Sequence, residues 1–164
     1  MAMAYEIKLA DNDDEVLLQE IMLASEMDLV GDIEDHVIIR DAVKLYGGAL
    51  LYQLDHDLFH LLTIAVSGTE RSAGLGSRLL QSLLHKPWQY CYGGIKPETA
   101  EFRVTTVARG SSRNFYLKNG FSTCSFTELK PPFATQCQNC PDDSHCQSAA
   151  MVFVHDNSAT TGTP

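Results

Sequence analysis

The feature that most constrains the fold of this chain is an apolar strand that runs through a glycine-containing turn into an amphipathic helix. The run LLTIAV at residues 61–66 predicts the strand, and the turn TERSAGLGS follows at residues 69–77. The segment LGSRLLQSLLHK at residues 75–86 then repeats leucine at helical spacing and ends before Pro87. A turn that enters a helix presents unpaired backbone N–H groups at the positive end of the helix dipole. The sequence therefore predicts an anion site here, with phosphate as the typical ligand.

The glycines of this turn narrow the choice of motif. Gly74 and Gly76 let the backbone approach an anion without interference from Cβ atoms. The turn is not a P-loop, because no Gly-Lys-Ser/Thr follows Gly68 at the required distance, and it lacks the third glycine of a dinucleotide fingerprint. The remaining match is Arg-x-x-Gly-x-Gly, beginning at Arg71. Two glycines near a helix start also occur in a simple turn and cap, so the motif alone leaves that alternative open.

A second motif, RNFYLKNGF, lies one helix and one strand further along the chain. Its pattern of aromatic, Tyr, x, Lys, x, Gly, Phe is formed by Phe115, Tyr116, Lys118, Gly120 and Phe121. Together, the glycine turn and this motif resemble the corresponding segments of the GCN5-related N-acetyltransferase (GNAT) superfamily. The resemblance covers nearly the whole chain. It implies an acetyltransferase domain at residues 1–155, and we expect the remaining residues 156–164 to be a disordered tail.

The chain departs from the family pattern at three positions. Ser72 stands where the family often has glycine, Ala73 where it has a basic residue, and Arg109 where asparagine is common. These departures weaken the expected CoA binding but leave the backbone donors in place. They keep open the alternative of a degenerate acyl-CoA-binding module that catalyses nothing.

The resemblance implies an α/β fold with one mixed, mostly antiparallel sheet of six to seven strands flanked by about four helices. Residue patterns predict strands at residues 5–10, 49–54, 58–66, 99–108, 121–129 and 148–156. Helices are predicted at residues 11–27, 32–48, 75–86 and 111–121, the second of them ending at the Gly47-Gly48 pair.

Acetyl-CoA is the cosubstrate that the resemblance implies. The turn would hold its pyrophosphate, and backbone N–H groups of the preceding strand would polarise the thioester carbonyl. The expected cofactor-binding residues are Ile64, Ala65, Val66, Arg71, Ser72, Ala73, Gly74, Leu75, Gly76 and Ser77.

Two residues are candidates for proton transfer. The resemblance places Tyr116 beside the leaving sulfur, where a phenol can donate a proton as the thiolate develops. His60 lies six residues before Val66, where some relatives carry a glutamate base, and histidine has a suitable pKa for that task. The alternatives are that Tyr116 only packs the helix on the sheet, that His60 caps the start of a strand, and that no dedicated base exists.

The segment CQNCPDDSHC at residues 137–146 is the third candidate site. Its candidate metal ligands are Cys137, Cys140, His145 and Cys146. The Cys-x-x-Cys spacing suits zinc, although neighbouring His and Cys residues rarely bind one ion together. A structural zinc, a redox-sensitive disulfide and free thiols are three open alternatives, and a protein-docking role for this hairpin is a fourth.

Composition limits the partners and the location. Twelve basic and 21 acidic residues give a net charge of −9, which argues against nucleic acid and anionic membranes as partners. No apolar run reaches 18 residues, and the first residues lack the pattern of a signal peptide, so we expect a cytoplasmic protein. A homodimer is left open.

The acceptor is expected to be cationic. In the family, the segment between the first two helices usually walls the acceptor pocket. Here that segment, SEMDLVGDIEDH, carries Glu26, Asp28, Asp32, Glu34 and Asp35 and no basic residue. Part of this charge would serve the predicted helix, with Asp32 as its N-cap. The rest either is a solvated surface or attracts a cationic amine.

The leading hypothesis is an acetyl-CoA-dependent N-acetyltransferase that moves the acetyl group to a primary amine by direct attack on the thioester. We expect a cationic small-molecule amine as the substrate. A protein acetyltransferase that acts on lysine or on N-termini is an alternative.

Overall fold

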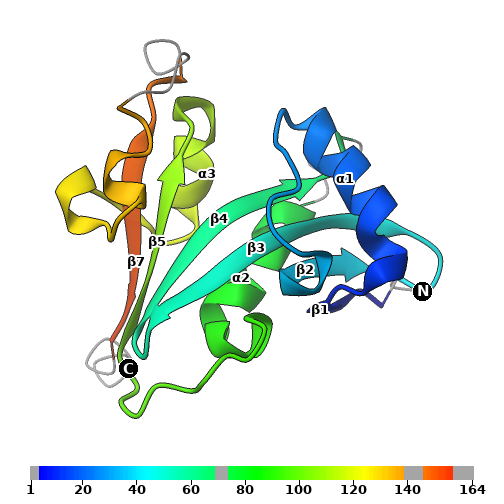
Figure 1. The fold of residues 1–164 in the computed structure, drawn as a ribbon, viewed down its shortest axis with the longest axis horizontal. Helices are drawn as coiled ribbons and strands as arrows, with labels where there is room; N and C mark the ends of the chain where they lie inside the picture. The colour runs from blue at the N-terminus through cyan, green and yellow to red at the C-terminus, as the bar shows by residue number, and fades with distance from the viewer. Residues whose placement is uncertain (1–3, 69–73, 139–145, 157–164) are drawn as a thin grey trace. The chain divides into compact units, whose positions relative to one another are not determined.

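The computed structural model describes residues 4–68, 74–138 and 146–156, and its described strands form one seven-stranded sheet in the order β1-β2-β3-β4-β5-β7-β6 (Figure 1). The strands are β1 (Glu6–Leu9), β2 (His36–Arg40), β3 (Leu45–Asp55), β4 (Leu58–Val66), β5 (Phe102–Ala108), β6 (Ser122–Cys124) and β7 (Ala149–His155). The α-helices in this described part are α1 (Glu15–Ala24), α2 (Leu75–His85) and α3 (Arg113–Lys118). The α/β class and the strand number are confirmed. Three α-helices flank the sheet in the described residues, because one of the four predicted helices forms a hairpin instead.

The chain divides into two compact units. Unit 1 comprises Met1–Gln53 and Leu61–Lys96, and unit 2 comprises Leu54–His60 and Pro97–Pro164. Unit 1 contains the glycine turn and α2, whereas unit 2 contains both His60 and Tyr116.

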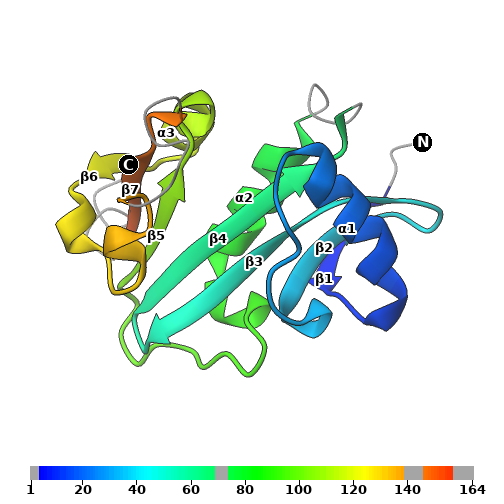
Figure 2. The ribbon, with the colours of Figure 1, turned by 45° about the horizontal axis from the view of Figure 1, so that its top comes forward.

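In unit 1, α1 and α2 cover opposite faces of the strands (Figure 2). On α1, the fully buried Leu18 and Met22 pack into a core cluster with Ile38 of β2. On α2, the amphipathic pattern in the sequence corresponds to buried side chains on one face, namely Leu75, Leu79, Leu80, Leu83 and Leu84. Burying these leucines fixes the orientation of α2, and with it the position of Gly74 at its start.

The helix predicted at residues 32–48 is wrong, because this segment forms the β2–β3 hairpin. Residues 36–39 are buried without alternation, so their pattern does not distinguish a strand from a helix. The turn is fixed by the carboxylate of Asp41, which accepts hydrogen bonds from the backbone N–H groups of Val43 at 2.8 Å and Lys44 at 2.7 Å. At Gly48, a Cβ atom would lie 2.6 Å from the carbonyl oxygen of Val37, so this glycine allows close strand contact and does not end a helix.

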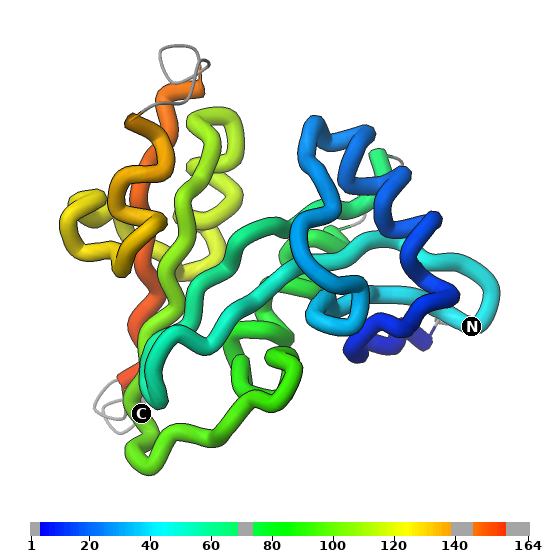
Figure 3. The backbone as a smooth tube through the Cα atoms, viewed as in Figure 1, coloured from blue at the N-terminus to red at the C-terminus, as the bar shows by residue number. Residues whose placement is uncertain are grey.

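Unit 2 is built on β7, which pairs antiparallel with β5 and with β6. The strand predicted at residues 121–129 stops at Cys124, because Ser125 caps a 3₁₀ turn at Phe126–Glu128. A further 3₁₀ turn, Phe133–Thr135, follows before β7, and Figure 3 traces this path. The helix predicted at residues 111–121 is the shorter α3, preceded by a 3₁₀ turn at Gly110–Ser112. Most of the predicted tail, residues 157–164, lies outside the described residues.

Candidate functional site

The start of α2 presents open backbone donors. Gly74 adopts a left-handed conformation (φ 77°, ψ 14°) as the N-cap, and within the described part of the chain no side chain caps the helix. The first helical hydrogen bond runs from the N–H group of Arg78 to the carbonyl of Gly74 at 3.0 Å, so the N–H groups of Leu75 and Gly76 precede it. Ser77 lies in the same turn, which carries no acidic residue. This end of α2 is therefore positive and has the donors that a phosphate oxygen requires.

The other predicted loop residues, Arg71, Ser72 and Ala73, lie outside the described residues.

The strand before the turn carries two buried hydroxyl groups beside the predicted thioester contacts. Ile64, Ala65 and Val66 are the last three residues of β4. Thr63 precedes them and Ser67 follows them, and the side-chain oxygens of both are buried without a hydrogen-bond partner among the described residues. An unpaired buried hydroxyl costs on the order of 1–3 kcal/mol. Such groups fit a ligand that brings amide or phosphate groups, as acetyl-CoA does.

His60 lies within β4 and is buried. Its Nδ1 atom lies 2.8 Å from the Oγ1 atom of Thr105 on β5. The ring of Phe133 stacks on the imidazole, with 3.8 Å between the ring centroids and 14° between the planes. Burial lowers the pKa of His60 to about 4. His60 is therefore neutral at physiological pH, and it is the third residue of its strand, so it does not cap the strand's start.

Tyr116 lies on α3 and is also buried. Its hydroxyl shares a hydrogen bond with the side chain of Thr106 on β5. Its ring packs edge-on against Phe115 and Phe121, each with centroids 5.2 Å away. Burial raises the pKa of Tyr116 to about 12, and the bond to Thr106 partly opposes that rise. The residue thus packs α3 on the sheet, and its phenol is hydrogen-bonded to Thr106.

Sequence reasoning missed the partners of both residues. Thr105 and Thr106 are buried and adjacent on β5, where each binds a different candidate. The available signal was a pair of threonines inside an apolar strand, since buried hydroxyls need partners. Nothing in the sequence near Phe133 indicates that it stacks on His60.

The cysteine-rich segment is only partly within the described residues. Cys137 and Cys146 are partly buried free thiols, whereas Cys140 and His145 lie outside the described residues. Within the described ranges, no group of three or more His, Cys, Asp or Glu side chains is placed to hold a metal ion. The zinc hypothesis therefore has no support from the described residues.

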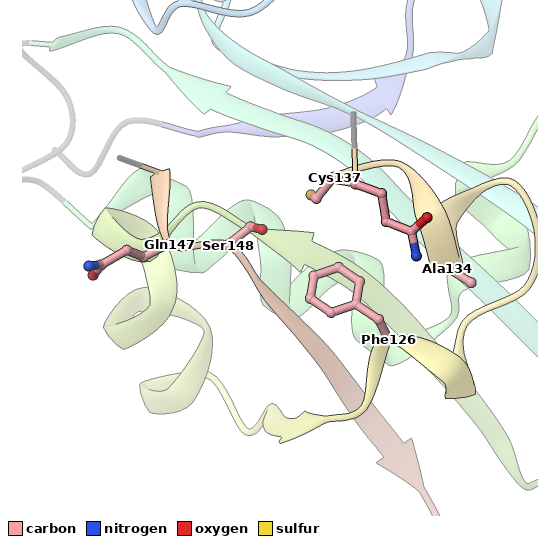
Figure 4. A pocket seen from close by; sticks show the side chains of 6 residues that line it. Phe126, Ala134, Cys137, Gln147 and Ser148 are labelled. Carbon is pink, nitrogen blue, oxygen red and sulfur yellow. The ribbon is translucent and has the colours of Figure 1, made fainter. Parts of the chain in front are cut away.

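A pocket of about 360 Å³ lies in this part of unit 2. Figure 4 shows the ring of Phe126 between Ser148 and Ala134, with Cys137 and Gln147 also lining the pocket. Ala134 follows Phe133, the residue that stacks on His60. The pocket therefore borders the turn that covers the histidine.

The acidic segment lies in unit 1, and its charges face solvent. Glu26, Asp28, Asp32 and Glu34 are exposed, whereas Met27 packs against the core. Asp32 is not the N-cap of an α-helix: it precedes the 3₁₀ turn Ile33–Asp35 and makes no side-chain cap. The backbone carbonyl of Asp32 instead lies 2.9 Å from the Nδ1 atom of the buried His36.

The described strands form one seven-stranded sheet, and α2 follows β4 along the chain with Gly74 as its N-cap. The chain belongs to the acetyltransferase (GNAT) family, whose model matches residues 5–121. No curated protein matches the sequence significantly. No helix among the described residues is long and apolar enough to cross a membrane.

Solved structures share this fold at low sequence identity. N-acetylglutamate synthase from Neisseria gonorrhoeae, complexed with coenzyme A and N-acetyl-glutamate, is 18% identical with a TM-score of 0.71; the match covers 95% of this chain and 36% of the synthase. This chain therefore spans little more than a third of that protein's length. Tetrahymena GCN5 is 18% identical with a TM-score of 0.58, covering 93% of this chain and 96% of GCN5. Diaminobutyrate acetyltransferase from Paenibacillus lautus, complexed with L-2,4-diaminobutyric acid and coenzyme A, is 12% identical with a TM-score of 0.56. This match covers 93% of this chain and 95% of the acetyltransferase.

Proposed function

We propose that this chain transfers the acetyl group of acetyl-CoA to the primary amine of a cationic small molecule. The observation that carries the proposal is the start of α2, where left-handed Gly74 is the N-cap and no side chain of the described residues caps the helix. Family membership supplies the class of reaction.

The residues of unit 1 would hold the cosubstrate. The N–H groups of Leu75 and Gly76 would bind its pyrophosphate, with Ser77 and the preceding loop residues around them. Backbone N–H groups at Ile64–Val66 would bind along the thioester arm, where they stabilise negative charge on the carbonyl oxygen. Acetyl-CoA, when bound, supplies the activated acyl group.

The residues of unit 2 would move the protons. When the amine attacks the thioester carbon, a C–N bond forms, the C–S bond breaks, and the nitrogen becomes far more acidic than a free ammonium. His60 would accept that proton on Nε2, and Tyr116 would donate its proton to the departing sulfur. Both groups suit these roles only as neutral species, which their burial favours. Exchange with solvent would then restore both side chains.

The charge of unit 1 supports a cationic acceptor. Asp28 and Asp32 are exposed in a segment without basic residues, in a chain of net charge −9. Such a surface raises the local concentration of an ammonium compound. Two relatives whose structures contain N-acetyl-glutamate and L-2,4-diaminobutyric acid support a small-molecule acceptor. A cytoplasmic location, a homodimer and a zinc or disulfide in the cysteine-rich segment remain separate expectations.

The proposal is tested by measuring CoA thiol release with acetyl-CoA against a panel of amines. The panel contains polyamines, amino acids, aminoglycosides and lysine peptides, with an amine-free reaction to subtract hydrolysis. We expect release above that background with a cationic small amine, together with its acetylated product. Release only with peptides would point to the protein acetyltransferase. Saturable acetyl-CoA binding without release for any amine would favour the non-catalytic module.

A further inference from the structure

We propose that Thr105 and Thr106 are positioning residues that hold the proton acceptor His60 and the proton donor Tyr116 on opposite faces of the sheet. The inference rests on the proposed function, in which those two side chains move the protons. Neither threonine contacts the reacting atoms in this account; each acts through the side chain that it binds.

The arrangement follows from the regular geometry of β5. Its pairing with β7 runs without a register shift and includes Thr105 opposite Val152 and Thr106 opposite Met151. Successive side chains of a regular strand point to opposite faces. Because Thr105 binds His60 and Thr106 binds Tyr116, the two candidates lie on opposite faces of β5.

Other contacts in unit 2 agree with this assignment. Tyr116 packs on Phe121, which in turn contacts Phe153 with centroids 5.8 Å apart. Phe153 is opposite Val104 in the register, and Val104 shares its face of the strand with Thr106. The Tyr116 side of β5 is therefore defined by two independent sets of contacts.

Thr105 selects which nitrogen of His60 carries the proton. Its hydroxyl donates to the backbone carbonyl of Phe59 at 3.4 Å, so its oxygen is available to accept from Nδ1 of His60 at 2.8 Å. With the proton on Nδ1, the Nε2 atom keeps its lone pair. That atom is then the one that accepts the proton from the amine.

Thr106 has the opposite hydrogen-bonding role, because Thr105 accepts a hydrogen bond from its partner whereas Thr106 would donate one. A phenol that must give its own proton to a thiolate cannot spend that proton on a neighbour. In this proposal the Thr106 hydroxyl donates to the oxygen of Tyr116, so the phenol proton stays available for the sulfur. The lowering effect of this bond on the pKa of Tyr116 agrees with a bond that stabilises the phenolate.

The separation gives each proton-transfer group its own hydrogen-bond partner. Thr105 orients the base and Thr106 orients the acid, so the two side chains are positioned independently.

The experiment compares four variants by ¹⁵N NMR of the histidine rings and by steady-state kinetics. Thr105→Val and Thr106→Val remove one hydroxyl each with little change in shape, whereas Thr105→Ser and Thr106→Ser keep the hydroxyl. Thr123→Val, at an exposed position of β6, is the matched surface control.

In the wild type, we expect the spectrum of His60 to show a protonated Nδ1 and a bare Nε2. Thr105→Val should produce a mixture of tautomers and lower kcat by about tenfold, the effect of losing one hydrogen bond of ordinary strength. Thr106→Val should leave the His60 signal unchanged and lower kcat by a similar factor. Both serine variants should recover most of the loss, and KM for acetyl-CoA should not change.

A wild-type His60 with its proton on Nε2 would overturn the role of Thr105. Equal disturbance of His60 by both valine variants would overturn the assignment to separate faces. The wild-type spectrum requires neither turnover nor a valine variant, so it decides the role of Thr105 even if Thr105→Val folds poorly or no amine is acetylated, and the serine variants then report on both threonines in a folded chain. In the latter case the proposed function fails while the spectra still report on the two threonines.

Discussion

The Nδ1 atom of His60 and the Oγ1 atom of Thr105 lie 2.8 Å apart, although 45 positions separate the two residues in the sequence. This contact joins β4 to β5 within unit 2 and fixes the ring that Phe133 covers. His60 is buried, and burial alone lowers its pKa, which makes the pH behaviour of His60 the first property to test.

Folding stability should decrease in acid because of His60. Burial holds its folded pKa at about 4, below the unfolded value of 6.5, so the unfolded chain binds the extra proton first. The loss therefore begins as pH falls through 6.5 and continues to about pH 4, at about 1.4 kcal/mol per pH unit between them. Urea unfolding at several pH values should show a flatter profile in His60→Gln.

His56 provides the matched control for that measurement. It is exposed in the β3–β4 turn, where the hydrogen bond that its Nδ1 atom donates to the carboxylate of Asp55 raises its pKa. The stabilising effect of His56 is present at low pH and is lost as pH rises. His56→Gln should therefore make the free energy of unfolding fall more steeply as the pH is lowered. A shift in the same direction for both variants would contradict the assignment to His60.

The pH dependence of catalysis should also report on His60. The acid limb of the kcat/KM profile should lie near pH 4 in the wild type and should be lost when His60 is replaced.

Acetyl-CoA binding should require an uncharged start of α2. Gly74→Asp should abolish binding because it places a carboxylate where the pyrophosphate would lie, whereas Gly74→Asn should retain part of it. Gly93→Asp is the matched control, because Gly93 also has positive φ, 68° against 77°, and open space where a Cβ would lie. The backbone strain of the two aspartate variants is therefore similar. Isothermal titration calorimetry measures acetyl-CoA binding by each variant. Normal binding by folded Gly74→Asp would mean that the pyrophosphate does not bind at the start of α2.

Tyr116→Phe should lower kcat by roughly 10²-fold with little change in acetyl-CoA affinity, as expected for the loss of a general acid. Tyr46→Phe is the matched control in unit 1. Tyr46 is equally buried, at 6% exposure, and its hydroxyl donates to Asp41. Both variants should lose about 1 kcal/mol of stability, yet only Tyr116→Phe should lose turnover. Equal kcat values would reduce Tyr116 to a packing residue.

Neutralising the acidic segment should weaken acceptor binding. Asp28→Asn together with Asp32→Asn should raise KM for the amine about two- to fivefold and change kcat less, because exposed charges contribute little per pair. The KM of the wild type should also rise with ionic strength. Glu98→Gln with Glu101→Gln removes the same charge from unit 2 and should leave KM unchanged. Indifference of KM to salt and to both pairs would contradict a cationic acceptor.

The strand β4 and the helix α2 could be predicted because their information is local. Leucines spaced for one helical face and a glycine that tolerates positive φ sit next to one another in the sequence. The hairpin at residues 36–55 could not be predicted, since the four consecutive buried residues at its start show no alternation of buried and exposed positions. Gly48 allows close contact between strands and does not end a helix. Strand pairing replaced the helix there through contacts that lie far apart in the sequence.

The same distinction applies to the site. His60 and Tyr116 were reachable by counting from motifs, whereas Thr105, Thr106 and Phe133 acquire their roles only through the pairing of β5 and the path of the chain before β7. Adjacent threonines in a buried strand indicate that their hydroxyl groups have hydrogen-bond partners, but the sequence does not show which residues these partners are.

The most direct test of the central claim is the balance of products from one reaction of acetyl-CoA with the best amine of the panel. Mass spectrometry quantifies the acetylated amine, and a thiol reagent quantifies free CoA. The account predicts equal amounts of the two, formed by the wild type and strongly reduced in Tyr116→Phe. Free CoA accompanied by acetate alone, or no consumption of acetyl-CoA by a chain that binds it, would contradict acetyl transfer as the function of this protein.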